Sequence, residues 1–442
     1  MLKKINNNSF SKNFIYSIVI LFPIIITMKS LVLNMFTILL SLTYIIFFFG
    51  DLKKKLFNFY IINFVLIFLF YIFINTIINY QNFEIVLKSL GNFRYILISL
   101  SVFFVLQQLS SQKKKIFFFI NLFFICLIGL DIIYQYNFKE NIFGFPAQMC
   151  TEQNECARHS GVFKDELIAG AYLSQLGLLF FVLIKEEKII QNRYRNLFTS
   201  LIFLLLLCSI LYAGERNAYL ITFLSIIIFY LLKKKFFTFI KLLIFLMLIV
   251  GLMSQSSYVI KNRLIKFVDS GAICKKEDSD CVIIKKMSEN PWIYHYKAAI
   301  ELFLQKPITG HGLKSFRQKC HETNIDKDTV KYKHKYRDYR ACSSHPHSYV
   351  FEFLSEQGLI GLLFYIGLIL LILKGVIENF LKDKNKNRII LFGIGAIILS
   401  VIFPFKPSGS FFSTFNSSVF FYLLGFLIFY LEKSNNKNSI KN

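Results

Sequence analysis

Residues 197–235 read LFTSLIFLLLLCSILYAGERNAYLITFLSIIIFYLLKKK. Two apolar runs, 197–213 and 217–232, are separated only by a short turn that contains Arg216. A helix needs roughly 20 mostly apolar residues to cross a bilayer. The stretch therefore predicts two antiparallel transmembrane helices, with a lysine cluster at one end and an arginine in the turn at the other.

The same pattern recurs along the whole chain. Of its 442 residues, 55% are hydrophobic and 17% aromatic, which exceeds what the core of a soluble domain requires. The further apolar runs lie near 14–28, 31–50, 56–78, 92–109, 116–135, 167–184, 236–254, 349–373, 389–405 and 417–431. We therefore predict an all-α polytopic membrane protein with about twelve transmembrane helices.

The basic residues define a topology. The net charge of +25 does not indicate a nucleic-acid partner, because most Lys and Arg lie in short clusters between apolar runs, without nucleic-acid fold signatures. Short cytoplasmic loops are rich in Lys and Arg. Clusters such as Lys53–Lys55, Lys113–Lys115 and Lys233–Lys235 all face the cytoplasm in one arrangement, which also places both termini there.

This topology divides the chain into three regions. Residues 1–254 hold nine helices and a smaller external loop at 136–166. Residues 255–348 form a large external segment before the tenth helix, and its length and the helical spacing of 294–305 predict a small folded subdomain. Residues 349–442 hold the last three helices and a cytoplasmic tail.

Six of the eight cysteines fall in the two external segments. An even number of cysteines confined to an oxidising side indicates disulfides. The most economical pairs are Cys150 with Cys156, Cys274 with Cys281, and Cys320 with Cys342. Zinc is the alternative, but no CxxC pair or tight Cys/His cluster supports it, and we expect no metal.

The candidate chemistry lies in Ser343–Ser348, which reads SSHPHS and precedes the tenth span. The free N–H groups and dipole of a helix N-terminus there would attract anions and lower the pKa of His347. A neutral imidazole is what a general base requires. On helical spacing, His345 would lie about 200° around from His347. The alternative is that both histidines are polar caps at the membrane interface.

The helix that follows has a glycine face. Gly358 and Gly361 share the face of His347, where they would let another helix approach closely, while Glu352 and Glu356 fall nearly opposite.

These residues resemble those of the O-antigen ligase family. His347 and Ser348, with Gly358 and Gly361, match the family pattern H-[N/S/Q]-x9-G-x-x-G. Residues 307–313, PITGHGL, resemble its P-x-x-G-x-G element, and residues 158–163, RHSGVF, resemble its R-x-S-G-T-F element. The layout of twelve helices with a large external loop before the tenth is also similar.

The resemblance implies a glycosyltransferase of the bacterial inner membrane with a periplasmic active site. Its partners would be an undecaprenyl-diphosphate-linked glycan, a lipid A-core acceptor and membrane lipids, with no cofactor. His347 would be the base, and Arg216 and Arg158 would hold the diphosphate, since Arg clasps phosphate oxygens bidentately. His345 would contact substrate. The alternative for each arginine is an interfacial anchor or a partner for Glu215 or Asp165.

One element departs from the family. The family often carries a further Arg near a Trp before the P-x-x-G-x-G element, but residues 290–297 read NPWIYHYK. Lys297, Arg317 or Arg340 could supply that charge.

Other functions fit parts of the pattern. An O-antigen polymerase or a protein O-oligosaccharyltransferase of the same superfamily could share this bundle and loop. A flippase or other transporter could also have twelve helices, but it should show polar residues near mid-membrane and symmetry between its halves. Here the candidate polar residues cluster at the external mouth, which favours an enzyme.

Overall fold

The computed structural model describes residues 9–56, 59–151, 155–186, 192–233, 236–261, 291–326, 342–382 and 386–438. Nearly all of these residues are helical. The longer helices are α2 (Ser9–Ile25), α3 (Ser30–Leu56), α4 (Tyr60–Ile78), α5 (Phe83–Gly91), α6 (Arg94–Gln108), α7 (Ser111–Phe138), α9 (Leu178–Glu186), α10 (Asn192–Ala213), α11 (Arg216–Lys233), α12 (Phe236–Ser256), α15 (Pro291–Gln305), α18 (Tyr349–Lys382), α19 (Lys386–Val401) and α20 (Thr414–Asn438). The short elements are β1 (Gln148–Cys150), β2 (Cys156–Arg158), the 3₁₀ turns η1 (Gly161–Phe163) and η5 (Cys320–Glu322), α8 (Ala169–Tyr172), the π-helical turn η2 (Leu173–Gly177), α13 (Tyr258–Ile260) and α16 (Phe316–Lys319).

The predicted class, an all-α polytopic membrane protein, is confirmed. Among the described residues, eight helical segments are long and apolar enough to cross a membrane. Four shorter apolar helices lie at 12–25, 216–232, 243–253 and 388–401, where spans were also predicted. Because these four fall short of the usual crossing length, the count of twelve stays a prediction.

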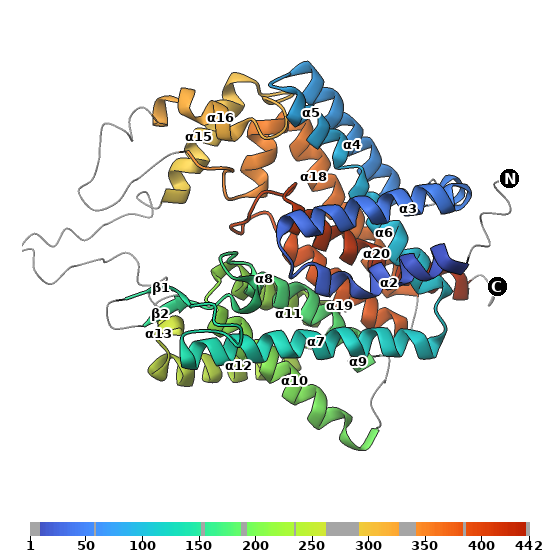
Figure 1. Cartoon of the computed structure of the whole chain (residues 1–442), viewed down its shortest axis with the longest axis vertical. Coiled ribbons are helices and arrows are strands. Elements are labelled where there is room, and N and C mark those ends of the chain that lie inside the picture. The colour runs from blue at the N-terminus through green and yellow to red at the C-terminus, as the bar shows by residue number, and fades with distance from the viewer. Residues whose placement is uncertain are drawn as a thin grey trace, which may run out of the picture.

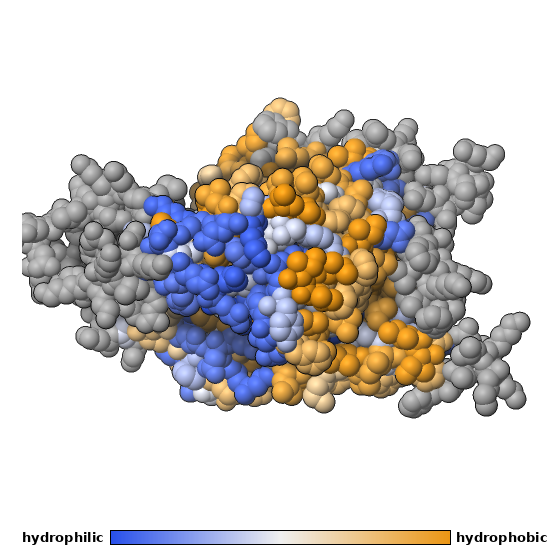
Figure 2. All heavy atoms as spheres, turned by 90° about the horizontal axis from the view of Figure 1, so that it is seen from above, coloured by the Kyte–Doolittle hydropathy of each residue, from blue (hydrophilic) through white to orange (hydrophobic). Residues whose placement is uncertain are grey.

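The two ends of the bundle differ. β1, β2, α13, α15 and α16 lie at one end, whereas α2 begins and α20 ends at the other (Figure 1). In the view of Figure 2, hydrophilic residues gather toward the first of these ends and hydrophobic residues cover most of the remainder. The described parts of the two loop segments thus lie at one end of the bundle, while α2 begins and α20 ends at the other.

The described part of the segment 255–348 has a small core of its own. Ala298 and Leu302 of α15 are fully buried against Phe316 of α16 and Cys320. The stretch expected to be helical, 294–305, lies within α15. In the smaller loop segment, 136–166, β1 and β2 form a two-stranded antiparallel sheet that the sequence analysis did not predict.

Two predicted disulfides are confirmed. Cys150 and Cys156 bridge β1 and β2, with Cα atoms 3.8 Å apart. Cys320 and Cys342 join η5 to the segment that leads into α18, with Cα atoms 5.5 Å apart. The third predicted pair, Cys274 with Cys281, lies outside the described residues.

At Gly358, α18 packs against a loop and not, as had been expected, against another helix. At Gly358 the helix is broken, with φ 66° and ψ −161°. The backbone of residues 307–312 docks there, donating from Gly312 N to Glu356 O over 2.7 Å and accepting at Pro307 O from Leu359 N over 2.8 Å. The backbone of Gly310 meets that of Gly358 so closely that a Cβ on either residue would have no room. The close approach at Gly361 is to Gln357 of the same helix.

Gly358→Ala is therefore expected to destabilise the protein strongly. The backbone conformation at Gly358 is one that essentially only glycine adopts, at a cost of about 1–3 kcal/mol for other residues. A Cβ would also lie 2.3 Å from the Ile308 carbonyl oxygen. The measurement is the midpoint of heat-induced loss of the monodisperse peak in size-exclusion chromatography of the detergent-solubilised protein.

Gly144→Ala is the matched control, because Gly144 also has a positive φ, 78°, but an added Cβ would meet nothing within 4 Å. Equal midpoints for the two variants would show that the docking of 307–312 against α18 contributes little.

Candidate functional site

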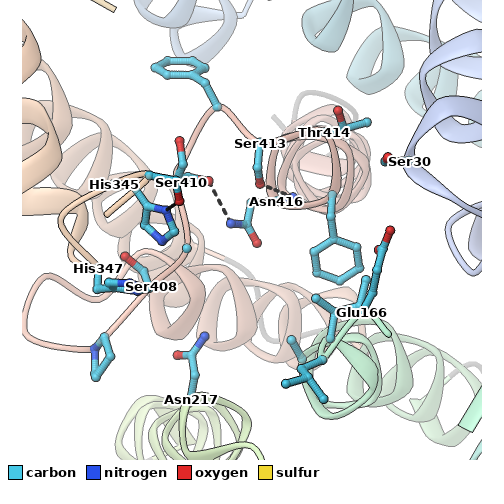
Figure 3. Close-up of a pocket in the computed structure, with 18 of the residues that line it drawn as sticks. Ser30, Glu166, Asn217, His345, His347, Ser408, Ser410, Ser413, Thr414 and Asn416 are labelled. Atoms are coloured by element: carbon cyan, nitrogen blue, oxygen red, sulfur yellow. Dashed lines mark hydrogen bonds between the residues drawn. The ribbon is translucent and has the colours of Figure 1, made fainter. Parts of the chain in front are cut away.

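A cavity of about 980 Å³ lies at the end of the bundle that carries β1 and β2. Its lining includes four of the predicted site residues, namely Arg158, Arg216, His345 and His347. Figure 3 shows His345, His347 and Ser408 along one side of it, with Asn217 and Glu166 on other walls. Residues from β2, the start of α11 and the approach to α18 therefore meet around one space.

His347 is held just before α18 by its backbone. Its φ of 57° is unusual for a residue with a side chain, and its carbonyl accepts a hydrogen bond of 2.9 Å from Ser408 N. Its ring lies 5.3 Å from that of His295 on α15. Within the described part of the chain, neither ring nitrogen of His347 has a hydrogen-bond partner, so the imidazole is available to a substrate.

The expected separation of the two histidines is wrong. The rings of His345 and His347 lie only 4.3 Å apart, centroid to centroid. The 200° estimate assumed a helix, but α18 begins only at Tyr349, and the preceding residues follow an irregular path. His345 Nε2 is buried at the cavity and bonds to none of the described residues, while Nδ1 lies 2.8 Å from Ser344 Oγ.

The pKa of His347 is lowered, as expected, but for a different reason. Burial lowers the pKa of His347 to about 4, with a smaller contribution from His295. The helix dipole was the expected cause. Burial lowers the pKa of His345 as well, and together with a smaller contribution from His347 brings it to about 3. Both imidazoles are therefore neutral at pH 7, the form in which His can accept a proton.

The lowered pKa of His347 predicts that the enzyme stays active down to an unusually low pH. If His347 is the base, the rate should persist from pH 7 to about pH 5 and halve near pH 4, whereas an unperturbed His would lose half near pH 6.5. Folding stability should fall as the pH is lowered from about 6.5 to about 4, because in that range the unfolded chain binds a proton at His347 and the folded chain does not. The measurement is kcat/KM against pH, with chromatography at each pH to count folded protein. A midpoint near 6.5 would contradict the assignment.

Arg158 and Glu215 form part of a second wall of the cavity. Arg158 Nη1 donates to Gly214 O over 3.1 Å, which ties the hairpin to the turn before α11. The buried Glu215 carboxylate accepts from Gly170 N over 2.7 Å and Ala171 N over 3.0 Å, and so caps α8. Burial raises the pKa of Glu215 to about 7, against an opposing effect of Arg158. Arg216 follows directly as the first residue of α11.

A buried lysine lies behind this wall. Lys406, in the loop between α19 and α20, is only 3% exposed. Its ammonium donates to Asn217 Oδ1 over 3.3 Å and lies 5.0 Å from the Tyr349 ring centre. Burial lowers the pKa of Lys406 to about 7. The contact holds Asn217, a lining residue, beside Arg216.

Lys314 is a lining residue that the sequence argument missed. Its backbone N–H donates to Glu356 Oε2 over 2.8 Å, and its ammonium bonds to Ser410 Oγ and lies 4.0 Å from Glu352 Oε1. Glu352 also accepts from Phe411 N over 2.8 Å. The two glutamates opposite the glycine face thus hold the 307–314 loop and the 408–411 loop against α18. The available signal was the position of Lys314 directly after the P-x-x-G-x-G element.

The three candidates for the additional basic residue are placed differently. Arg317 lines the cavity. Lys297 is exposed on α15, with its ammonium 5.7 Å from the Tyr294 ring centre, and is not among the lining residues. Arg340 lies outside the described residues. Of the two that the structure describes, Arg317 is the one near His345 and His347.

One described group has the chemistry of metal ligands. His321, Asp326 and Cys342 bring their ligand atoms within 4.8 Å of one another, with His321 Nδ1 3.1 Å from Asp326 Oδ2. Because the sulfur of Cys342 is bonded to Cys320, it does not offer a thiolate.

Part of the chain matches a known protein family. Residues 201–366 match the O-antigen ligase family model, a span that holds Arg216, His347, Gly358 and Gly361 and ends before the last two helices. No curated protein matches the chain. Residues 201–366 are therefore similar to the O-antigen ligase family, whose model describes this part of the chain.

Proposed function

We propose that this protein transfers a glycan from undecaprenyl diphosphate to a lipid A-core acceptor at the periplasmic face of the bacterial inner membrane, with both of its termini in the cytoplasm. The observation that carries the proposal is the position of Arg216 between two spaces of opposite character. Arg216, Trp292 and Pro407 line both the polar cavity and an apolar groove of about 560 Å³.

The groove suits a polyprenyl chain. Its walls come mainly from apolar side chains of α10, α11 and α12, such as Leu207, Phe223 and Leu246. An isoprenoid lipid diphosphate has an apolar tail, a doubly charged linkage and a polar glycan, in that order. With the tail in the groove and the diphosphate at Arg216, the first sugar would reach the cavity that contains His347.

The residues then suggest a single displacement. The acceptor hydroxyl oxygen forms a bond to the anomeric carbon of the donor sugar, and His347 takes the hydroxyl proton. The bond from that carbon to the diphosphate oxygen breaks, and undecaprenyl diphosphate departs with its electron pair. Arg216 and Arg158 stabilise the charge that develops on the diphosphate, so no metal is required. One displacement inverts the configuration at the anomeric carbon.

The test is the surface glycolipid of a strain that lacks the gene. We expect lipid A-core without its glycan cap, together with retained lipid-linked glycan, and restoration by the intact gene. A cap of one repeat unit would indicate a polymerase, and an unchanged glycolipid with unglycosylated protein would indicate a protein O-oligosaccharyltransferase. Failure to move glycan to the periplasm would indicate a flippase.

A further inference from the structure

The cavity has a third wall, formed by residues of α3, α5, α6 and the start of α20, that carries no step of the proposed reaction. Figure 3 shows Thr414 and Ser30 on this side, away from His347, with Asn416 between them and Ser410. Its polar residues are mostly amides and hydroxyls, including Asn34, Asn92 and Asn416. Such groups are suited to the hydroxyls of a sugar.

Arg94 is the charged centre of this wall. It is half-buried at the start of α6, where its Nη2 donates to Asn34 Oδ1 over 2.6 Å and to Tyr95 Oη over 2.9 Å. Its guanidinium carbon also lies 4.6 Å from the Tyr95 ring centre. All of these partners are neutral, and Nε has no hydrogen-bond partner among the residues that the structure describes. A half-buried guanidinium with only neutral partners is costly unless an anion completes the site.

Among the described residues no carboxylate bonds to Arg94, so the anion would have to come from a ligand. Among the described lining residues, the acidic ones are Glu166 and Glu215, and the Glu215 carboxylate already caps α8. Asn92 is 5% exposed, and within the described part of the chain its Nδ2 has no hydrogen-bond partner. Asn34 Oδ1 also accepts from Thr414 Oγ1 over 3.2 Å, so the orientation of the Asn34 amide beneath Arg94 is fixed. The wall therefore holds an uncompensated cation and an unused amide donor in a prepared position.

We infer that this wall binds an oxyanion, a phosphate or a carboxylate, that is carried by the acceptor glycan, with Arg94 as its principal contact. The inference rests on the proposed function. The acceptor is favoured over the donor because Arg158 and Arg216 occupy a different wall, and an attacking hydroxyl must approach the anomeric carbon from the side opposite the departing diphosphate.

Steady-state transfer by the purified full-length protein tests the inference with three acceptors: intact lipid A-core, phosphatase-treated lipid A-core and carboxylate-reduced lipid A-core. Arg94→Gln should raise the KM for the intact acceptor about 10- to 100-fold, the range for a charge-assisted hydrogen bond, with little change in the KM for the donor. Removal of the recognised anion from the acceptor should cause the same loss in the native protein and no further loss in Arg94→Gln. If the phosphatase-treated acceptor gives this pattern, the recognised anion is a phosphate. If the carboxylate-reduced acceptor gives it, the recognised anion is a carboxylate.

Two variants complete the design. Arg94→Lys keeps the charge without the planar fork and should lie between the native protein and Arg94→Gln. Lys139→Gln removes one charge from an exposed residue that does not line the cavity, and should change neither KM. Equal use of all three acceptors by the native protein, or a rise in donor KM alone in Arg94→Gln, would overturn the inference. Absence of transfer to any acceptor by the native protein would instead overturn the proposed function.

Discussion

Replacement of His347 by asparagine should abolish glycan transfer while the protein remains folded in the membrane. Asparagine tolerates the positive φ at this position better than alanine, so backbone strain is kept small. It cannot accept a proton from a hydroxyl at neutral pH. Loss of a general base typically lowers the rate by about 10² to 10⁴. The measurement is transfer from purified lipid-linked glycan to lipid A-core in the presence of a chelator, relative to the amount of monodisperse protein.

His345→Asn is the matched control. Its ring is 4.3 Å from that of His347, so both variants disturb the same cluster. We expect a smaller loss, expressed mainly in the KM for a substrate, because His345 would contact substrate without accepting the proton. If the two histidines were only interfacial caps, both variants would lower the protein level and activity would fall in proportion. Normal transfer by well-folded His347→Asn would refute the proposed mechanism.

Arg216→Ala should cause the second large loss, and Arg216→Lys a partial one. Lysine retains the charge at the junction of groove and cavity but lacks the planar fork that binds two phosphate oxygens together. Loss of one group that stabilises a developing oxyanion costs about 10²- to 10³-fold in kcat. The measurement is kcat and the KM for the lipid-linked donor, and the effect should appear in both, because the diphosphate is charged before and during the reaction.

Comparison with Arg158→Ala distinguishes a role in binding the diphosphate from a role in stabilising the fold. Arg158 donates to Gly214 O and lies near the buried Glu215, so its loss should also reduce thermal stability. Arg216→Ala should reduce activity with little loss of stability. If Arg216→Ala lost stability and activity together, and addition of more donor did not restore activity, an anchoring role would replace the proposed one.

Local features of the sequence were sufficient for the architecture. A helix that crosses lipid requires a long apolar run, and such runs can be recognised in the sequence without knowledge of any tertiary contact. The disulfides between Cys150 and Cys156 and between Cys320 and Cys342 followed from the same topology, because it separated the cysteines by compartment. The candidate base and Arg216 stood out as polar residues at the ends of apolar helices, on the side predicted to be external.

The tertiary structure alone decided how these residues meet. The strands β1 and β2 are three residues each, too short for a periodic signal. Gly358 accepts a loop because residues 307–312 fold back onto α18, a contact between distant parts of the chain. Arg94 faces the cavity of His347 although the two are far apart in sequence. Hydrophobic patterning fixes which residues enter the membrane, but the docking of helices and loops determines which polar side chains share a cavity and how far burial shifts their pKa values.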